Sequence, residues 1–248
     1  MIVSHSRKFV FVHIHKTAGE SISTALVPYL SGRDLLLGTT LRGEFANAWY
    51  SRRHRLQKHS GVRRARAFVG EEAWGEYFKF SFVRDPFDRL RSLYFYFEKM
   101  LARRRETHPR NALLWLPGTD FRDPLKWPGM EAFLETDDFS GFLRHPAFSP
   151  AIMGARPQSV LLTDENGTLD VDFVGKFETL AADFADLAAR LGLEGASLGH
   201  RNASRNRTTT SARTPDPAEA ADRALVAELY ARDYALFGYP LPQAASSR

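Results

Sequence analysis

The chain has 248 residues, of which 44% are hydrophobic and 25% charged, and its formal net charge is +5. This length fits one α/β domain, and the composition is that of a globular protein able to bury a core, which excludes extensive disorder. The absence of cysteine excludes disulfides and thiolate chemistry.

No segment of the sequence predicts export or insertion into a membrane. The first apolar run is only about seven residues long and is interrupted by His13 and His15. A signal peptide needs a longer apolar region, and a membrane helix needs about 20 apolar residues. We therefore expect a cytoplasmic protein without a membrane span.

Positive charge is concentrated in two stretches. Residues 52–66 contain seven Lys or Arg and no acid, and residues 103–105 are three arginines. Such stretches are typical either of a solvated basic helix face or of a surface that attracts an anionic partner. No zinc-finger, RNP or homeodomain pattern is present, so we expect no nucleic-acid partner.

The first half of the chain predicts two strand–turn–helix units. Residues 8–14 alternate as a strand does, and a helix follows the loop that begins at His15. Residues 31–57 are polar and give no clear element, and a helix is expected over about 60–73. A second strand, 77–83, leads to a helix from Pro86 to about Arg105, with Asp85 as its N-cap.

The second half predicts a loop over 107–128 and short helices over 129–145. Residues 158–175 read as two short strands around a turn at Asn166-Gly167. Helices are expected over 177–191 and 217–236, separated by an Arg-rich loop. Alternating strands and helices predict a single α/β domain over 1–248, with a mainly parallel central sheet flanked by helices.

The loop after the first strand, HKTAGES (15–21), has the features of an anion site. A helix N-terminus exposes N–H groups and the positive end of its dipole. Gly19 permits close approach, Thr17 and Ser21 add hydroxyls, and Lys16 adds a mobile charge. His15 stands where a Walker A loop requires glycine. An ordinary turn before a capped helix would also fit this short pattern.

A second candidate site consists of Arg84, at the end of the second strand, and Ser92 in the following helix. Ligands of open α/β sheets collect beyond the carboxyl ends of the strands, so both motifs should face one crevice. Arginine is suited to bidentate phosphate binding. A salt-bridged helix start is the structural alternative, and we assign that role to Asp85 and Arg89.

Together these motifs resemble sulfotransferases that use 3′-phosphoadenosine 5′-phosphosulfate (PAPS). FVHIHKTAGESIS is similar to the family's 5′-phosphosulfate loop and FSFVRDPFDRLRSLY to its 3′-phosphate motif, with the same Arg-to-Ser spacing. LQKHSG, Gln158 in RPQSVLL, VDFVGKFETLAADF, HRNAS and ELYARDYALFGY resemble the carbohydrate-type branch, which includes heparan sulfate 2-O-sulfotransferases. Bacterial sulfotransferase family 2 proteins are similar too. The resemblance implies a P-loop NTPase-like sulfotransferase fold.

The resemblance also implies a set of residue roles. Lys16 would stabilise charge on the bridging oxygen, and PAPS would be held by Thr17, Ala18, Gly19, Ser21 and Ile22 at the 5′-phosphosulfate and by Arg84 and Ser92 at the 3′-phosphate. Asn202, Ser204 and Arg205 resemble a second contact to this nucleotide, or else form a surface loop. Because a sulfuryl group carries less charge than a phosphoryl group, we predict no metal requirement.

Many relatives have proline at the position of His15 and Ser or Thr at that of Glu20. A carboxylate at Glu20 would repel a sulfate, so we leave Glu20 out of the predicted site.

The acceptor hydroxyl requires a base, and histidine is the side chain best matched to this task near neutral pH. Among eight histidines, His59 in QKHSG resembles the base of the heparan sulfate branch, with His15 as the second candidate. A surface histidine in a basic stretch is the alternative for His59. We treat His13 as structural.

The expected acceptor is a carbohydrate hydroxyl, on a neutral or an acidic glycan. A lipid or small-molecule hydroxyl is the alternative within the same chemistry. A nucleotide kinase or other phosphate-loop NTPase, and a non-catalytic binder of anionic polymers, are the alternatives from other classes.

Overall fold

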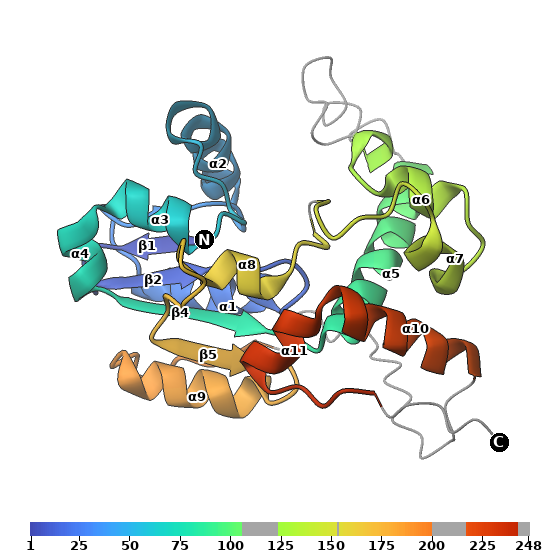
Figure 1. Ribbon diagram of the computed structural model, residues 1–248. Coiled ribbons are helices and arrows are strands. Elements are labelled where there is room, and N and C mark those ends of the chain that lie inside the picture. The colour runs from blue at the N-terminus through green and yellow to red at the C-terminus, as the bar shows by residue number, and fades with distance from the viewer. Residues whose placement is uncertain (106–123, 153, 200–216, 243–248) are drawn as a thin grey trace. The chain divides into compact units, whose positions relative to one another are not determined.

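The computed structural model describes residues 1–105, 124–152, 154–199 and 217–242, which fall into two compact units. The first comprises residues 1–85 and 158–213, and the second residues 86–157 and 214–248, of which only the described residues are considered below. The first unit contains the sheet, and the second is helical (Figure 1).

The sheet has five strands in the order β3-β1-β2-β4-β5. Its strands are β1 (Ile2–Ser4), β2 (Phe9–Val12), β3 (Leu35–Leu36), β4 (Phe78–Val83) and β5 (Phe173–Lys176). β2, β4 and β5 run parallel, with Val12 opposite Ser81 and Val83 opposite Lys176. β1 runs antiparallel to both β2 and β3.

The prediction of a mainly parallel sheet is therefore wrong, because the sheet is mixed. Residues 5–8 form a turn too short for a crossover, so the chain reverses and β1 pairs with β2 as a hairpin. No strand was predicted before residue 8. The predicted strands at 8–14 and 77–83 are confirmed as β2 and β4.

Helices cover both faces of the sheet. They are α1 (Gly19–Leu26), α2 (Leu41–His54), α3 (Val62–Val69), α4 (Glu71–Glu76), α8 (Gln158–Leu162) and α9 (Leu180–Arg190), with a 3-10 turn η1 (Val27–Tyr29). Ile22 and Leu26 of α1 and Phe184 and Leu187 of α9 pack with sheet phenylalanines in one core. α3 and α8 contact each other, and α8 lies over the other face of the sheet (Figure 1).

Several predicted elements of this unit need correction. Residues 31–57 contain β3 and α2. The helix expected over 60–73 is two helices, because Gly70 has a φ of 89° and ends α3. Residues 158–162 are a helix and not a strand, whereas the turn at Gly167 is confirmed by an isolated bridge between Thr163 and Leu169.

The second unit is built around the long helix α5 (Pro86–Arg105), as predicted. It also contains η4 (Pro124–Lys126), α6 (Met130–Leu134), α7 (Phe139–Arg144), α10 (Pro217–Leu229) and α11 (Ala231–Phe237). The helix expected over 217–236 is interrupted at Tyr230. Arg89 is buried and donates to the carbonyl oxygens of Gly154, Ala155 and Arg156, so its role is structural but rests on main-chain hydrogen bonds and not on the salt bridge that was expected.

Candidate active site

The loop after β2 adopts a backbone that side chains rarely tolerate. Lys16 has a φ of 67° and Ala18 a φ of 63°, in the left-handed region that costs a non-glycine residue about 1–2 kcal/mol. The Thr17 hydroxyl donates to the carbonyl oxygen of Ile14 at 3.2 Å and ties the loop to the strand end. Strain of this kind persists where surrounding structure enforces it, commonly at functional sites.

The start of α1 is suited to an anion. Ala18 is the N-cap residue and forms no side-chain cap, so the first N–H groups of the helix are not covered by a capping side chain. These groups carry the positive end of the helix dipole. The strained loop therefore places Lys16 directly before a helix N-terminus that favours negative charge.

Gly19 is required by the close approach of its neighbour His13. A Cβ atom at Gly19 would lie 2.0 Å from two atoms of the His13 ring. His13 is 3% exposed, and its ring stacks on Phe11 with a centroid distance of 5.5 Å. The buried histidine thus fixes where the helix begins, which agrees with the structural role expected of His13.

Arg84 directly follows β4 and is buried against the end of the next strand. Its guanidinium lies over the ring of Phe177 at 4.1 Å. Gln158 holds the main chain of Arg84 in both directions, accepting from its N–H at 2.9 Å and donating to its carbonyl oxygen at 2.8 Å. These two hydrogen bonds fix the main chain of Arg84. Phe177 and Gln158 both lie in motifs quoted above, but no sequence pattern predicted that either would contact Arg84.

Lys16 and Arg84 leave the sheet at the same edge. β2 and β4 are adjacent and parallel, with Val12 opposite Ser81, so the residues that follow both strands emerge together. Neighbouring strands lie about 4.8 Å apart. Two basic side chains and a helix N-terminus are therefore brought together at one edge, an arrangement suited to a ligand with two anionic groups.

Residues 57–61 form a turn that is anchored to α2 and α8. Gln57 and Ser60 close the turn, since the N–H of Gln57 donates to the Ser60 hydroxyl at 2.9 Å. The N–H of Lys58 donates to Asn47 of α2 at 2.6 Å. At Gly61 a Cβ atom would lie 2.7 Å from the carbonyl oxygen of Leu161, so only glycine fits there.

This turn places His59 against the loop that contains Lys16. Nδ1 of His59 lies 2.9 Å from the carbonyl oxygen of His13. Because a carbonyl only accepts, Nδ1 carries the proton, and Nε2 of the neutral ring keeps its lone pair. Burial, the neighbouring His15 and other positive groups hold the pKa of His59 well below its usual 6.5. His59 is half-buried and neutral at pH 7, which a general base requires.

The ring of His15 stacks on that of His59, with a centroid distance of 3.4 Å and an interplanar angle of 28°. His13 meets His59 edge-on at 4.6 Å. Beside them Glu20 forms an ion pair with Lys58. The carboxylate of Glu20 is thus compensated by a lysine of the His59 turn, which reduces the repulsion expected for an anion at this position.

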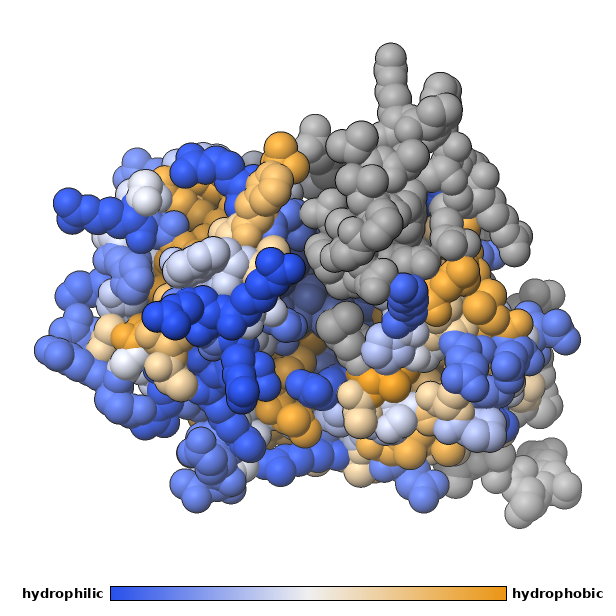
Figure 2. All heavy atoms as spheres, turned by 90° about the horizontal axis from the view of Figure 1, so that it is seen from above, coloured by the Kyte–Doolittle hydropathy of each residue, from blue (hydrophilic) through white to orange (hydrophobic). Residues whose placement is uncertain are grey.

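Some residues of the basic stretch 52–66 form hydrogen bonds or ion pairs within the chain, and others are exposed. Arg63 donates to the carbonyl oxygens of Thr163 and Asp164, and Arg66 pairs with Glu71. Arg52, Arg53 and Arg55 are exposed at the end of α2. Figure 2 shows the face where α2 lies, with strongly hydrophilic side chains beside hydrophobic ones. Arg52, Arg53 and Arg55 are therefore solvated, whereas Arg63 and Arg66 are held by contacts within the chain that neither explanation included.

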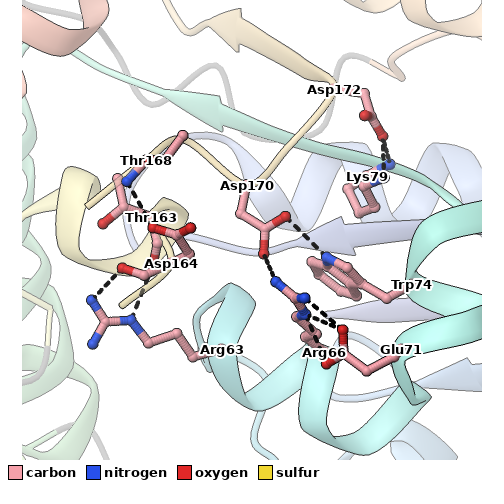
Figure 3. A network of polar contacts seen from close by, with 10 residues as sticks. All are labelled: Arg63, Arg66, Glu71, Trp74, Lys79, Thr163, Asp164, Thr168, Asp170 and Asp172. Carbon is pink, nitrogen blue, oxygen red and sulfur yellow. Dashed lines mark hydrogen bonds and ion pairs between the residues drawn. The ribbon is translucent and has the colours of Figure 1, made fainter. Parts of the chain in front are cut away.

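Arg63 and Arg66 belong to a polar network at the opposite edge of the sheet (Figure 3). Asp170 accepts from Trp74 at 3.0 Å, and Asp172 pairs with Lys79 at 2.9 Å. These residues precede or begin β4 and β5, so the network lies at the amino ends of the strands. A hollow there is lined by Arg63, Arg66, Ala67, Glu71, Asp164, Glu165 and Asp170. We assign this network a structural role.

The remaining predicted residues are placed as follows. Ser21 and Ile22 lie in the first turn of α1, with Ile22 buried in the core. Ser92 is half-buried in α5 and belongs to the second unit. Asn202, Ser204 and Arg205 lie outside the described residues.

The profile of the sulfotransferase family matches residues 1–240. The chain therefore belongs to this family, and it is a transferase of sulfuryl groups. No curated protein and no solved structure matches it. None of the helices in the described part of the chain is long and apolar enough to cross a membrane.

Proposed function

We propose that the protein transfers a sulfuryl group from PAPS to a hydroxyl of a carbohydrate. The observation that supports the donor best is the pairing of Lys16 and Arg84 beyond adjacent parallel strands. PAPS carries one anionic group at each end of its ribose, so it suits two basic sites at one edge. Membership of the sulfotransferase family supports the same donor.

The proposed roles are divided between the loop and helix start at residues 16–22 and the segment that contains Arg84 and Ser92. Residues Thr17 to Ile22 hold the 5′-phosphosulfate through N–H groups and hydroxyls, and Lys16 stabilises the charge that develops on the bridging oxygen. Arg84 and Ser92 hold the 3′-phosphate, and Asn202, Ser204 and Arg205 add a second contact to the 3′-phosphoadenosine. When bound, PAPS supplies the sulfuryl group, and the electron pair of the broken S–O bond stays on the phosphate oxygen.

His59 is proposed as the general base. Its Nε2 takes the proton of the acceptor hydroxyl while the hydroxyl oxygen forms its bond to sulfur. The hydrogen bond from Nδ1 to the His13 carbonyl holds the tautomer that this step needs. Burial keeps the pKa of His59 below neutral pH, so the ring is ready to accept a proton.

The carbohydrate acceptor is supported by the exposed basic end of α2. Arg52, Arg53 and Arg55 precede the His59 turn along the chain, and Gln57 of that turn donates to Ser51 of α2 at 2.8 Å. An acidic glycan would be attracted to this end of the helix. We also propose that both units act as one sulfotransferase domain and that the reaction needs no metal ion.

Thermal unfolding with nucleotides tests the donor. We expect 3′-phosphoadenosine 5′-phosphate, without metal, to raise Tm by roughly 5–10 °C at about 100 times its Kd. ADP at the same concentration should raise Tm by clearly less, because it lacks the 3′-phosphate. Stabilisation by ADP only with Mg²⁺, and indifference to the 3′-phosphate, would instead indicate a phosphate-loop NTPase.

Substitution of the proposed base tests the mechanism. His59→Ala should reduce transfer from labelled PAPS by about 100-fold or more and leave nucleotide binding intact. In the wild type, activity should fall only when the pH drops well below 6.5, because the lowered pKa keeps His59 neutral above that range. His54→Ala, which changes an exposed histidine of α2, is the control. Unchanged transfer in His59→Ala would rule this base out.

A further inference from the structure

Two contacts join the His59 turn to the loop and helix start that contain Lys16. The first is the stack of His15 on His59, at 3.4 Å between centroids. The second is the ion pair between Glu20 and Lys58, whose lysine side chain is only 14% exposed. Neither contact is needed to explain how an anion binds the loop.

We propose that His15 and Glu20 are positioning residues that clamp the Lys58–His59 turn onto the Lys16 loop. This inference rests on the proposed role of His59. Through the clamp, the base and the proposed donor site are held in one arrangement before any ligand binds. The remaining freedom of an imidazole is rotation about its side-chain torsions. The His13 carbonyl fixes Nδ1 of His59 by a hydrogen bond. The His15 ring, which is stacked on the His59 ring, blocks rotation of the His59 ring out of its own plane.

The stack also lowers the pKa of His59, because it brings the His15 ring close to the His59 ring. Two imidazolium rings at this separation repel each other, so a charge on His15 disfavours a proton on His59. The other charged groups that face His59 are Lys58 and the amino group of Met1, and the buried His13 adjoins it. His15, Lys58 and the amino group of Met1 each disfavour a proton on His59, whereas the hydrogen bond to the His13 carbonyl favours one. Among them, His15 contributes most after burial itself.

The titration of His59, followed by NMR of ¹⁵N-labelled histidine, tests the clamp without any turnover. Its pKa should be higher in both His15→Ala and His15→Phe than in the wild type, by about half a unit or more, because each variant removes a neighbouring charge. His54→Ala should leave the titration unchanged. A His59 titration that is the same in all four proteins would overturn the proposal.

Steady-state rates at pH 8, where His59 is neutral in every variant, separate position from charge. His15→Ala should lower kcat by about 10-fold or more with little change in the KM for PAPS. His15→Phe, which retains a ring able to stack, should recover most of that loss. A kcat equal in His15→Ala and the wild type would show that the stack positions nothing.

The ion pair has its own test in a double-mutant cycle. Glu20→Gln and Lys58→Gln should each lower kcat, and the double variant should be no slower than the slower single variant, because both remove one interaction. Additive effects would contradict a shared role. If no variant and no wild-type protein transfers sulfuryl from PAPS, the proposed function fails, whereas the NMR titration still decides whether His15 contacts His59.

Discussion

At the scale of single residues, the site depends on how closely the backbone of α1 approaches His13. Gly19 is the residue that permits this approach, since a Cβ atom there would overlap the His13 ring. The same ring stacks on Phe11 in the core and meets His59 edge-on. The buried side chain of His13, which directly follows β2, therefore determines where α1 begins and where the Lys16 loop lies.

Gly19→Ala should consequently destabilise the fold. We expect the free energy of unfolding to fall by about 1–3 kcal/mol, because the His13 ring must move within a packed core. Gly75→Ala is the matched control: no atom lies within 4 Å of a Cβ there, and alanine favours its helix by about 0.5–1 kcal/mol. Urea unfolding measures both. Equal stability of the two variants would contradict the predicted overlap.

The sequence predicted the basic residues of the candidate site but not the contacts that position them. Lys16 and Arg84 could be found because each follows a strand and precedes a helix. Their supports could not: Phe177 reaches Arg84 from the end of β5, and the stack of His15 on His59 joins positions far apart in the chain. Such contacts depend on strand order, which no local pattern reveals.

At the scale of elements, α2 is the largest departure from the sequence analysis. Its apolar residues Leu41, Phe45 and Trp49 recur every four positions, which is a helical period, yet all three face solvent at 77%, 68% and 57% exposure. The opposite side packs through Gly43 and through Tyr50, whose ring meets Phe68 of α3 at 5.5 Å. The segment therefore carries a helical period in its sequence, and the expectation of no clear element over 31–57 is wrong for α2.

Two leucines at the ends of this segment provide a matched test. Leu56→Ala removes a fully buried side chain beside the His59 turn and should lower the free energy of unfolding by about 2–5 kcal/mol. Leu41→Ala removes an exposed one and should change it by less than about 0.5 kcal/mol. Chemical denaturation distinguishes them. Similar losses in the free energy of unfolding in both variants would contradict the exposure of Leu41.

The short apolar run at 158–162 shows why strand and helix were confused. Gln158, Ser159, Leu161 and Leu162 are buried whereas Val160 is half exposed, which is the burial pattern of a helix face. So short a run cannot be assigned by periodicity alone. The helix has a consequence for the site, because it presents Gln158 to the main chain of Arg84.

At the scale of the whole molecule, the order β2-β4-β5 brings the parts of the site together. Three parallel strands end at one edge, and the residues after them supply Lys16, Arg84 and Phe177. The predicted alternation of strands and helices was sufficient to expect this edge. The two antiparallel pairings, of β1 with β2 and with β3, lie on the other side of β2 from β4, so the error about a mainly parallel sheet left that expectation intact.

Calorimetric titration tests most directly whether Lys16 and Arg84 bind opposite ends of one nucleotide. The wild type should bind 3′-phosphoadenosine 5′-phosphate about 10-fold or more tightly than adenosine 5′-phosphate, since a charged hydrogen bond contributes about 1.5–3 kcal/mol. Arg84→Ala should abolish this preference, and Lys16→Ala should weaken both ligands while preserving it. A wild type without preference, or an Arg84→Ala variant that retains it, would contradict the account.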